Sequence, residues 1–584
     1  MSGIRDPGSG IRGFEVQLRD AGDSAILLEL ERVIDAEVNA RAISIATAIS
    51  DQQPAGVRDV IATYRSVAIH FDPLSCDINS LRKTVGEAAA SPRVLAKGSL
   101  VEVPVAYGGD NGPDLDDVAA FAKLSTRAVI DRHCGPEYRV FMLGFLPGFA
   151  YMGIVDESIA APRKATPRTR IPAGSVGIAG RQTGVYPRSS PGGWQLIGRT
   201  PLHVFDPTRE PASLFRAGDR VKFVATAGIR DPGSRIRNAR AESGTDGSRI
   251  PDPGSRSITI LKPGLFTTIQ DGGRWGYQDR GVPVSGPMDR PAHRRANALV
   301  GNTLHAATLE ATLLGPELRF DQPALIAVTG ADLEVTIDDK PAAIDTPHRL
   351  KPGGTLRFGA RRSGTRAYVA IDGGIEVPVI LGSRSTHVVS GLGGIDGRAL
   401  RAGDRLALGS SNDQGSESNH TWRKTLGFAP QATGNRMGNG ARVRAMRGPQ
   451  DYYFDESAFD WLTRTRFAVS PRSDRMGYRL VPGFSRIPNP ESSSTAFVAS
   501  QIPGAMISDA AFTGGIQIPP SGEPILLMAD RQTTGGYPQI ATVITADLSL
   551  AGQLAPGDWI EFALCTRSEA IAALTEQEEA FGAG

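Results

Sequence analysis

A nine-residue element that occurs three times constrains the fold more than any other feature of this sequence. It reads FRAGDRVKF at 215–223, LRAGDRLAL at 400–408 and LAPGDWIEF at 554–562. In each copy a Gly-Asp turn leads into residues of alternating polarity, which is typical of a half-buried strand. The repeat predicts three related β-units, near residues 99–226, 258–410 and 441–565.

Two of these units share a second element. AGRQTGVYP at 179–187 is echoed by ADRQTTGGYP at 529–538, and an Ile-Pro pair precedes each copy. The chain also contains 68 Gly and 41 Pro among its 584 residues. Both residues weaken helix interiors, so this composition favours short strands joined by tight loops. We therefore expect a barrel or sandwich in each unit.

The N-terminal region has a different pattern. A strand is expected at 25–30, a helix at 34–49, a hairpin at 57–71 and a second helix at 78–90. These elements predict a compact α+β domain over 14–98. Two more helices are expected, at 115–134 and 291–300. The predicted fold class is mostly β, with a small α+β N-terminal domain.

Polar, Gly-rich segments separate these units. Residues 227–257 are rich in Arg, Ser, Gly, Asp and Pro, and cannot bury enough apolar surface to offset the entropy of ordering. We interpret them as a disordered linker, residues 1–13 as a disordered tail and 411–440 as a flexible loop. Residues 566–584 are expected to form a helical tail.

Composition excludes several classes of function. Basic residues number 64 and acidic residues 62, which gives no electrostatic reason to expect nucleic acid or a membrane surface as a partner. No apolar run reaches the roughly 18 residues that span a bilayer, and no secretory signal is visible, so we expect a cytoplasmic protein. The three Cys are widely separated, which argues against a disulfide framework or a Cys-rich zinc site.

Several catalytic signatures are missing from the sequence. It has no Gly-Lys for a phosphate loop, no His-Glu-x-x-His, no Gly-x-Ser-x-Gly and no Met-Lys-Met. We therefore expect no dedicated metal cage, no nucleophile elbow and no covalently attached biotin.

Candidate binding residues of the first half lie in Gly-rich loops. Residues 141–153 combine glycines with an aromatic cluster that could form a stacking wall, or simply a buried hairpin; the candidates there are Phe145, Pro147, Gly148, Phe149 and Tyr151. The repeated Arg-Gln-Thr loops offer a guanidinium, an amide, a hydroxyl and a phenol, a set that suits an anion beside an amide. Their candidate catalytic residues are Arg181, Gln182, Thr183, Tyr186, Arg531, Gln532 and Tyr537.

The second half adds a further group of candidates. Gln270, Asp271 and Arg274 lie on a Gly-rich bend, and Ser285 and Asp289 precede the expected helix, which either of them could cap. Glu310 lies in an apolar stretch, where a carboxylate is either paired with an Arg or catalytic.

Longer motifs resemble a known family. The first half is similar to the B subunit of bacterial ATP-dependent 5-oxoprolinases, also called allophanate hydrolase subunit 1, in GFLPGFAYMG at 144–153, RTRIPAGSVG at 168–177 and SPGGWQLIGRTP at 190–201. The second half is similar to the C subunit, also called allophanate hydrolase subunit 2, in GLFTTIQDGGR at 264–274, GVPVSGPMD at 281–289, ANALVGN at 296–302 and LEATL at 309–313. Both halves also resemble the carboxyltransferase region of urea carboxylase and the sporulation-kinase inhibitor pair.

The resemblance implies cyclophilin-like β-barrels in both halves. It also implies action with a separate 5-oxoprolinase A subunit, which together with this chain would open 5-oxo-L-proline to L-glutamate using ATP and Mg²⁺. On this interpretation Arg181, Arg274 and Arg531 are candidate anion clamps, and Gln182, Gln270 and Gln532 would hydrogen-bond the lactam amide. Asp271 or Asp289 would hold the magnesium ion.

Two other functions stay open at this stage. The chain could be a biotin-dependent carboxyltransferase acting on urea or another amide, with the biotin carried by a partner. It could instead be a regulatory protein that binds a kinase. The aromatic loops are candidate interfaces for a homo-oligomer.

Overall fold

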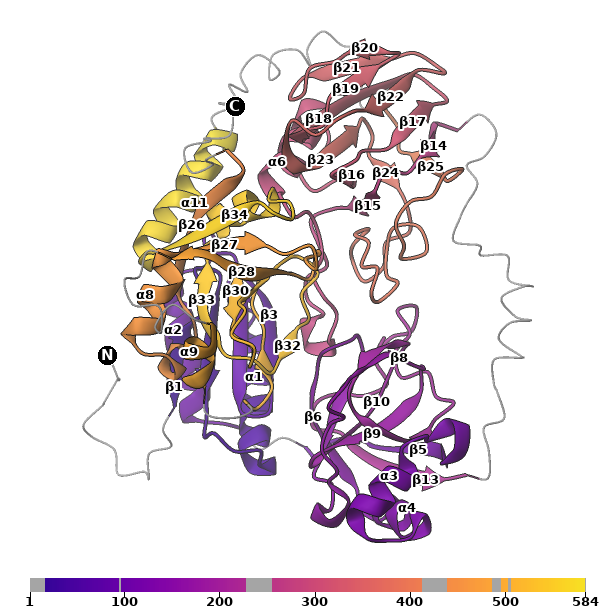
Figure 1. Cartoon of the computed structure of the whole chain (residues 1–584), viewed down its shortest axis with the longest axis vertical. Coiled ribbons are helices and arrows are strands. Elements are labelled where there is room, and N and C mark those ends of the chain that lie inside the picture. Colours follow the sequence, from indigo (N-terminus) through magenta and orange to yellow (C-terminus); the bar gives the residue numbers. More distant parts are fainter. Residues whose placement is uncertain are drawn as a thin grey trace.

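The computed structural model describes residues 16–93, 96–226, 255–411, 438–485, 495–502 and 506–582. Within these ranges the chain forms an N-terminal α+β unit, a first barrel, a two-sheet unit and a last barrel (Figure 1). The predicted tail at 1–13, nearly all of the predicted linker at 227–257 and most of the predicted loop at 411–440 lie outside the described residues.

The N-terminal unit is an antiparallel sheet in the order β1-β2-β4-β3, with two helices on one face. All six residues of β4 are buried because the sheet is covered on both faces. Val67, Ile69 and Phe71 contact the helix side, whereas Ala68 packs with Phe512 of the last barrel. The elements are β1 (Gln17–Asp20), β2 (Ala25–Glu29), α1 (Ala36–Gln52), β3 (Val57–Ala62), β4 (Ser66–Phe71) and α2 (Ile78–Ala90).

The first barrel closes in the order β10-β7-β6-β13-β5-β12-β9. Its first and last strands, β5 and β13, pair in parallel, with Arg220 opposite Leu100. The strands are β5 (Leu100–Tyr107), β6 (Tyr138–Leu143), β7 (Ala150–Gly153), β9 (Ser175–Ala179), β10 (Gln182–Val185), β12 (Gln195–Arg199) and β13 (Arg220–Ala225), beside the small pair β8 (Arg168–Ile171) and β11 (Ser190–Gly192) and the short helices η1 (Gly109–Asn111) and η2 (Glu157–Ile159).

The single helix expected at 115–134 is wrong, because the chain forms two helices there. These are α3 (Leu115–Ala122) and α4 (Thr126–Cys134). Lys123 has a φ of 53°, a left-handed conformation that ends α3. The Ser125 hydroxyl then accepts the amide of Ala128 and starts α4.

The last barrel repeats the closure of the first, in the order β26-β33-β30-β31-β28-β27-β34 with β26 parallel to β34. Its strands are β26 (Gly440–Arg447), β27 (Thr465–Val469), β28 (Gly477–Ser485), β30 (Gly515–Gln517), β31 (Ile525–Leu527), β33 (Gln539–Val543) and β34 (Trp559–Leu564), with the pair β29 (Asp509–Ala510) and β32 (Thr534–Gly535) alongside. Its helices are η6 (Asp451–Tyr453), α8 (Glu456–Arg464), α9 (Thr495–Ser500), η8 (Thr545–Asp547), α10 (Leu548–Gly552) and α11 (Arg567–Gly582). The predicted fold class, mostly β with a barrel in each half and a small α+β part, is confirmed.

Residues 258–410 form two sheets over one apolar core, so of the barrel and the sandwich expected for this unit the chain forms the two-sheet arrangement and not a closed barrel. The strand β25, which contains the end of the middle copy of the repeat at 400–408, pairs antiparallel with β14, whereas the matching strand pairs in parallel in both barrels. The strand order of the first sheet is β20 (Lys340–Pro341), β19 (Val335–Ile337), β22 (Thr355–Phe358), β17 (Glu317–Phe320), β14 (Ser257–Lys262), β25 (Arg405–Leu408) and β24 (Ile375–Glu376). The strand order of the second sheet is β15 (Phe266–Gln270), β16 (Thr308–Thr312), β23 (Ser363–Ile371), β18 (Ala324–Asp332) and β21 (Pro347–Leu350). The helices η3 (Gln278–Arg280) and α6 (Arg290–Leu299) follow β15 in the sequence.

The repeated Gly-Asp turn has the same geometry in all three units. The glycines at 218, 403 and 557 have φ of 92°, 88° and 87°, values that favour glycine. Each following Asp, at 219, 404 and 558, accepts the backbone N–H three residues before it. The repeat is therefore a local turn that directs the chain into a strand, whatever sheet that strand joins.

Segments far apart in the sequence lie side by side. The N-terminal sheet packs against the last barrel (Figure 1). The first barrel contacts the N-terminal unit, because Asn39 Nδ2 donates to the carbonyl of Phe141 at 2.9 Å. The loop before β7 contacts the second half, because the amide of Gly148 donates to the carbonyl of Arg280 at 2.9 Å and that of Phe145 donates to Thr534 Oγ1 at 3.1 Å.

Candidate functional site

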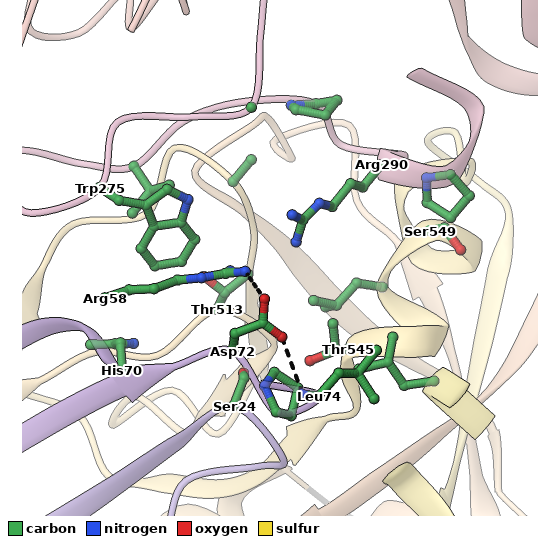
Figure 2. A pocket seen from close by; sticks show the side chains of 18 of the residues that line it. Ser24, Arg58, His70, Asp72, Leu74, Trp275, Arg290, Thr513, Thr545 and Ser549 are labelled. Carbon is green, nitrogen blue, oxygen red and sulfur yellow. Dashed lines mark hydrogen bonds and ion pairs between the residues drawn. The ribbon is translucent and has the colours of Figure 1, made fainter. Parts of the chain in front are cut away.

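A cavity of about 440 Å³ lies where three parts of the chain meet. The N-terminal sheet, the segment from 272 to the start of α6, and the last barrel with α11 each contribute to its wall. Figure 2 shows several of the side chains that enclose it. Its polar lining includes Arg58, His70, Asp72, Arg290, Thr513 and Thr545.

Two of the cavity's cations are neutralised by neighbouring carboxylates. Arg58 Nη2 contacts Asp72 Oδ2 at 2.5 Å, and the Arg58 guanidinium lies 4.8 Å from the centre of the Trp275 indole (Figure 2). Arg294 forms an ion pair with Glu578 of α11. The first pair lies within the N-terminal unit, whereas the second joins α6 to α11, and both neutralise charge in the lining.

Arg290, unlike Arg58 and Arg294, has no carboxylate partner among the described residues. Among the residues that the structure describes, none forms a hydrogen bond or an ion pair with its guanidinium, which extends into the cavity (Figure 2). Burial, together with the nearby Arg58 and Arg294, lowers the pKa of Arg290 to about 10, against the attraction of Glu578 and Asp72. The group is still charged at neutral pH, so the described residues leave one uncompensated positive charge in the cavity.

The imidazoles in the lining do not add to this charge. Burial lowers the pKa of His70 well below its usual value and also lowers that of His305. Both rings are therefore neutral at pH 7. The ring of His70 packs 5.3 Å from that of Phe512, where the N-terminal sheet meets the last barrel. Within the described part of the chain, the cavity thus combines one unpaired cation with neutral polar and aromatic walls, which suits a small anion.

The start of α6 is held firmly in place. Asp289 Oδ1 accepts the amide of Ala292 at 3.0 Å, and Asp289 Oδ2 accepts Gln553 Nε2 at 2.7 Å. The amide of Asp289 donates to the hydroxyl of Tyr368 at 2.8 Å. This cap fixes the backbone that carries Arg290.

Glu310 lies in a buried ion network behind the cavity. It pairs with Arg475 and accepts the amide of Met288 at 2.9 Å and the hydroxyl of Tyr368 at 2.7 Å. Arg475 also contacts Asp530 at 2.9 Å. Of the two expectations for Glu310, the structure shows pairing with an Arg. The network joins the two-sheet unit to the last barrel.

Comparisons with known proteins match both halves. The family model for the carboxyltransferase domain, subdomain C and D, matches residues 16–215, and that for subdomain A and B matches residues 280–564. The 5-oxoprolinase C subunit of Escherichia coli is 37% identical over 326 residues, which covers 56% of this chain and 96% of the relative. The 5-oxoprolinase B subunit of Bacillus subtilis is 44% identical over 220 residues, 36% of this chain and 92% of the relative.

This chain belongs to the carboxyltransferase-domain family of the 5-oxoprolinase B and C subunits.

A solved structure resembles nearly the whole chain. The crystal structure of TTHA0988 aligns with a TM-score of 0.76 at 33% identity, over 92% of this chain and 99% of that one. The 5-oxoprolinase B-like and C-like halves therefore occur together in one fold, and the cavity lies between elements of both.

Neither Arg181 nor Arg531 lines the cavity. Arg181 is exposed, and its Nε approaches the carbonyl of Val155 at 3.5 Å. Arg531 is fully buried, and its Nε donates to Thr513 Oγ1 at 3.0 Å, just behind the cavity wall. The roles of Arg181 and Arg531 as anion clamps stay predictions.

Two other residues of the repeated loops form hydrogen bonds with neighbouring parts of the chain. Gln182 Nε2 donates to the hydroxyl of Tyr64 at 2.7 Å, and Thr183 Oγ1 donates to the carbonyl of Gly177 at 3.0 Å. Tyr186 is buried, Gln532 is half-buried and Tyr537 is 39% exposed. Their catalytic roles stay predictions.

The aromatic loop forms an interior cluster. Phe149 and Tyr151 pack with Tyr186 and Trp194, and Phe145 lies at the edge of this cluster. Pro147 and Gly148 form the turn of the loop, and Gly148 contacts the second half through Arg280. None of the five predicted substrate-binding residues of this loop lines the cavity.

The predicted residues on the bend after β15 hold the neighbouring loop. Arg274 donates from Nε to the carbonyl of Ile380 at 2.8 Å, and Gln270 Nε2 donates to the carbonyl of Thr386 at 3.1 Å. Asp271 accepts the hydroxyls of Ser383 and Ser385 at 2.5 and 2.6 Å. Burial opposes ionisation of Asp271, but these hydrogen bonds outweigh it and lower its pKa.

The expected magnesium ligands do not fit that role. The oxygens of Asp271 are occupied by Ser383, Ser385 and the amides of Gly273 and Arg384, and those of Asp289 by the helix cap and Gln553. Within the described residues no group of three or more His, Cys, Asp or Glu side chains is arranged to hold a metal ion. No helix in the described part of the chain is both long and apolar enough to cross a membrane.

Sequence reasoning missed most of the cavity. Of the predicted residues, only Ser285 lines it. Arg290 could have been found from the sequence, because it directly follows Asp289, the predicted helix cap at the end of the motif at 281–289. Arg58, His70 and Trp275 had none, since each becomes part of the cavity only when three distant segments pack together.

Proposed function

We propose that this chain is the B and C component of an ATP-dependent 5-oxoprolinase and that, with a separate A subunit, it opens 5-oxo-L-proline to L-glutamate. The observation that carries the proposal is that relatives named as B and C subunits match the two halves over 92% and 96% of their own lengths. The cavity supports it, because its walls come from both halves.

The chemistry of the reaction suits such a cavity. A lactam is unreactive, so ATP must activate its oxygen before the ring can open. The substrate carries a carboxylate, and the activated oxygen carries phosphate, so binding calls for positive charge in a partly water-excluded place. Arg290 supplies that charge, and the neutral His70 and His305 with the hydroxyls of Thr513 and Thr545 supply polar surroundings that add none.

The test is reconstitution of the reaction. The full chain is mixed with the purified A subunit, ATP and 5-oxo-L-proline, and glutamate and inorganic phosphate are measured. We expect both products in equal amounts only when ATP and both proteins are all present. Equal glutamate formation by the A subunit on its own would overturn the proposal.

A carboxyltransferase is a second candidate, favoured by the description of the matching family as a carboxyltransferase domain. Its substrate would also be a carboxylated species that a cationic cavity can hold. A parallel reaction with urea and free carboxybiotin distinguishes the two. Loss of the carboxyl group from carboxybiotin that depends on urea, without glutamate formation in the first assay, would favour the carboxyltransferase.

A further inference from the structure

We propose that Arg290 is the anchor for the anionic group, carboxylate or phosphate, of a small molecule bound in the cavity between the N-terminal sheet, α6 and the last barrel. The inference deepens the proposed function by assigning an anion site within it. It depends on that function only for the choice of 5-oxo-L-proline as a probe.

The pattern of charge pairing points to Arg290. Arg58 is paired with Asp72 and Arg294 with Glu578, so the charges of the other two arginines of the lining are already paired. Among the described residues nothing hydrogen-bonds to the Arg290 guanidinium. Arg290 is half-buried, and even partial removal of a cation from water without a partner is costly, which a bound anion would offset.

The position of Arg290 is set before any ligand arrives. It occupies the first turn of α6, directly after Asp289, whose carboxylate is bound by Ala292 and Gln553. Pro291 stiffens the same turn. A guanidinium on a fixed backbone presents a planar pair of donors, which matches the oxygens of a carboxylate or a phosphate.

The shape of the cavity agrees with a small ligand. Its volume of about 440 Å³ is in the range of sites for small molecules. Figure 2 shows Trp275 and the Arg58–Asp72 pair across from Arg290. The indole offers an apolar face for a ring, so the anionic end and the ring of one ligand have separate places to bind.

Calorimetric titration of the intact chain, without the A subunit or ATP, tests the proposal. Three probes are compared: 5-oxo-L-proline, inorganic phosphate, and the neutral lactam 2-pyrrolidone, which lacks the carboxylate. We expect Arg290→Gln to weaken binding of the anionic probe about 10-fold or more, since a hydrogen bond to a charged group is lost. Arg290→Lys should retain part of the affinity because it keeps the charge.

The controls separate this effect from general damage. Arg127→Gln removes an exposed guanidinium of α4 that does not line the cavity and should leave every affinity unchanged. Thermal unfolding checks that each variant is folded. If only phosphate binds in an Arg290-dependent way, the anionic group held by Arg290 is a phosphate. If only 5-oxo-L-proline does so, that group is a carboxylate.

Two results would overturn the anion site. One is failure of the wild-type chain to bind either anion at millimolar concentration, and the other is equal affinity of the wild-type chain and Arg290→Gln. Neither result depends on turnover. A failed glutamate assay with intact, Arg290-dependent anion binding would count against the proposed function and leave the anion site standing.

Discussion

Individual side chains inside the first barrel carry a pH dependence of stability. His133 is fully buried between the hydroxyl of Tyr107 at 2.7 Å and Thr183 Oγ1 at 2.9 Å. Burial lowers its pKa to about 3. In the unfolded chain the value returns to roughly 6.5, so between these two values the unfolded state binds more protons than the native state.

Stability should therefore fall as the pH is lowered through this window. From pH 7 to pH 5 the contribution of His133 is a loss on the order of 2 kcal/mol. We expect His133→Gln to show a shallower decrease of the unfolding temperature over that range. Some decrease will persist, because the buried His293 has a pKa lowered to about 3 as well. An unchanged slope in the variant would contradict the assignment to His133.

At the scale of one element, α6 shows how a local signal positions a functional side chain. Asp289 was expected to cap this helix, and it does so while also receiving Gln553 from the last barrel. Burial raises the pKa of this carboxyl, although the hydrogen bonds oppose the shift. A helix cap and a contact between units therefore depend on the same two oxygens.

Asp289→Ala should destabilise the chain by about 1–2 kcal/mol through the lost cap and should also weaken anion binding, because the turn that carries Arg290 is no longer held. Asp35→Ala is the matched control. Asp35 caps α1 by accepting the amides of Glu37 and Val38, and none of these three residues lines the cavity. It should lower stability, measured by chemical unfolding, without changing anion affinity. Equal effects of the two variants on affinity would contradict this prediction.

At the scale of the whole molecule, one close approach joins the first barrel to the second half. Gly281 has a φ of 75°, and a Cβ placed on it would lie 2.5 Å from the carbonyl oxygen of Leu146. The neighbouring amide of Gly148 donates to the carbonyl of Arg280 at 2.9 Å. Only glycine allows the two loops to come this close.

Gly281→Ala should force these loops apart, at a cost on the order of 1–3 kcal/mol. The expected result is faster hydrogen exchange at the Gly148 amide, measured by mass spectrometry of the 144–149 segment. Gly276→Ala is the control, because Gly276 has a similar φ of 85° but no atom within 4 Å of an added Cβ. Similar exchange in both variants would show that backbone strain, rather than the contact with Leu146, is responsible.

Local features of this protein were readable from the sequence alone. The Gly-Asp turns, the alternating strands, the N-terminal α+β unit and the cap at Asp289 depend on neighbours a few residues away, so short-range patterns predict them. The family resemblance was also carried by contiguous motifs. The same reasoning failed at 115–134, because Lys123 adopts a left-handed conformation that cannot be predicted from its residue type.

Tertiary structure alone decided the rest. It determined that the middle repeat joins an open sheet, that Arg531 is buried and Arg181 exposed, and that Arg58, Arg290 and Thr513 surround one cavity. These outcomes depend on which distant segments pack together, and identical local patterns such as Arg-Gln-Thr are compatible with either burial or exposure. The sequence therefore determines the turns and strands, whereas the charge balance of the cavity exists only once the N-terminal sheet, the two-sheet unit and the last barrel have packed together.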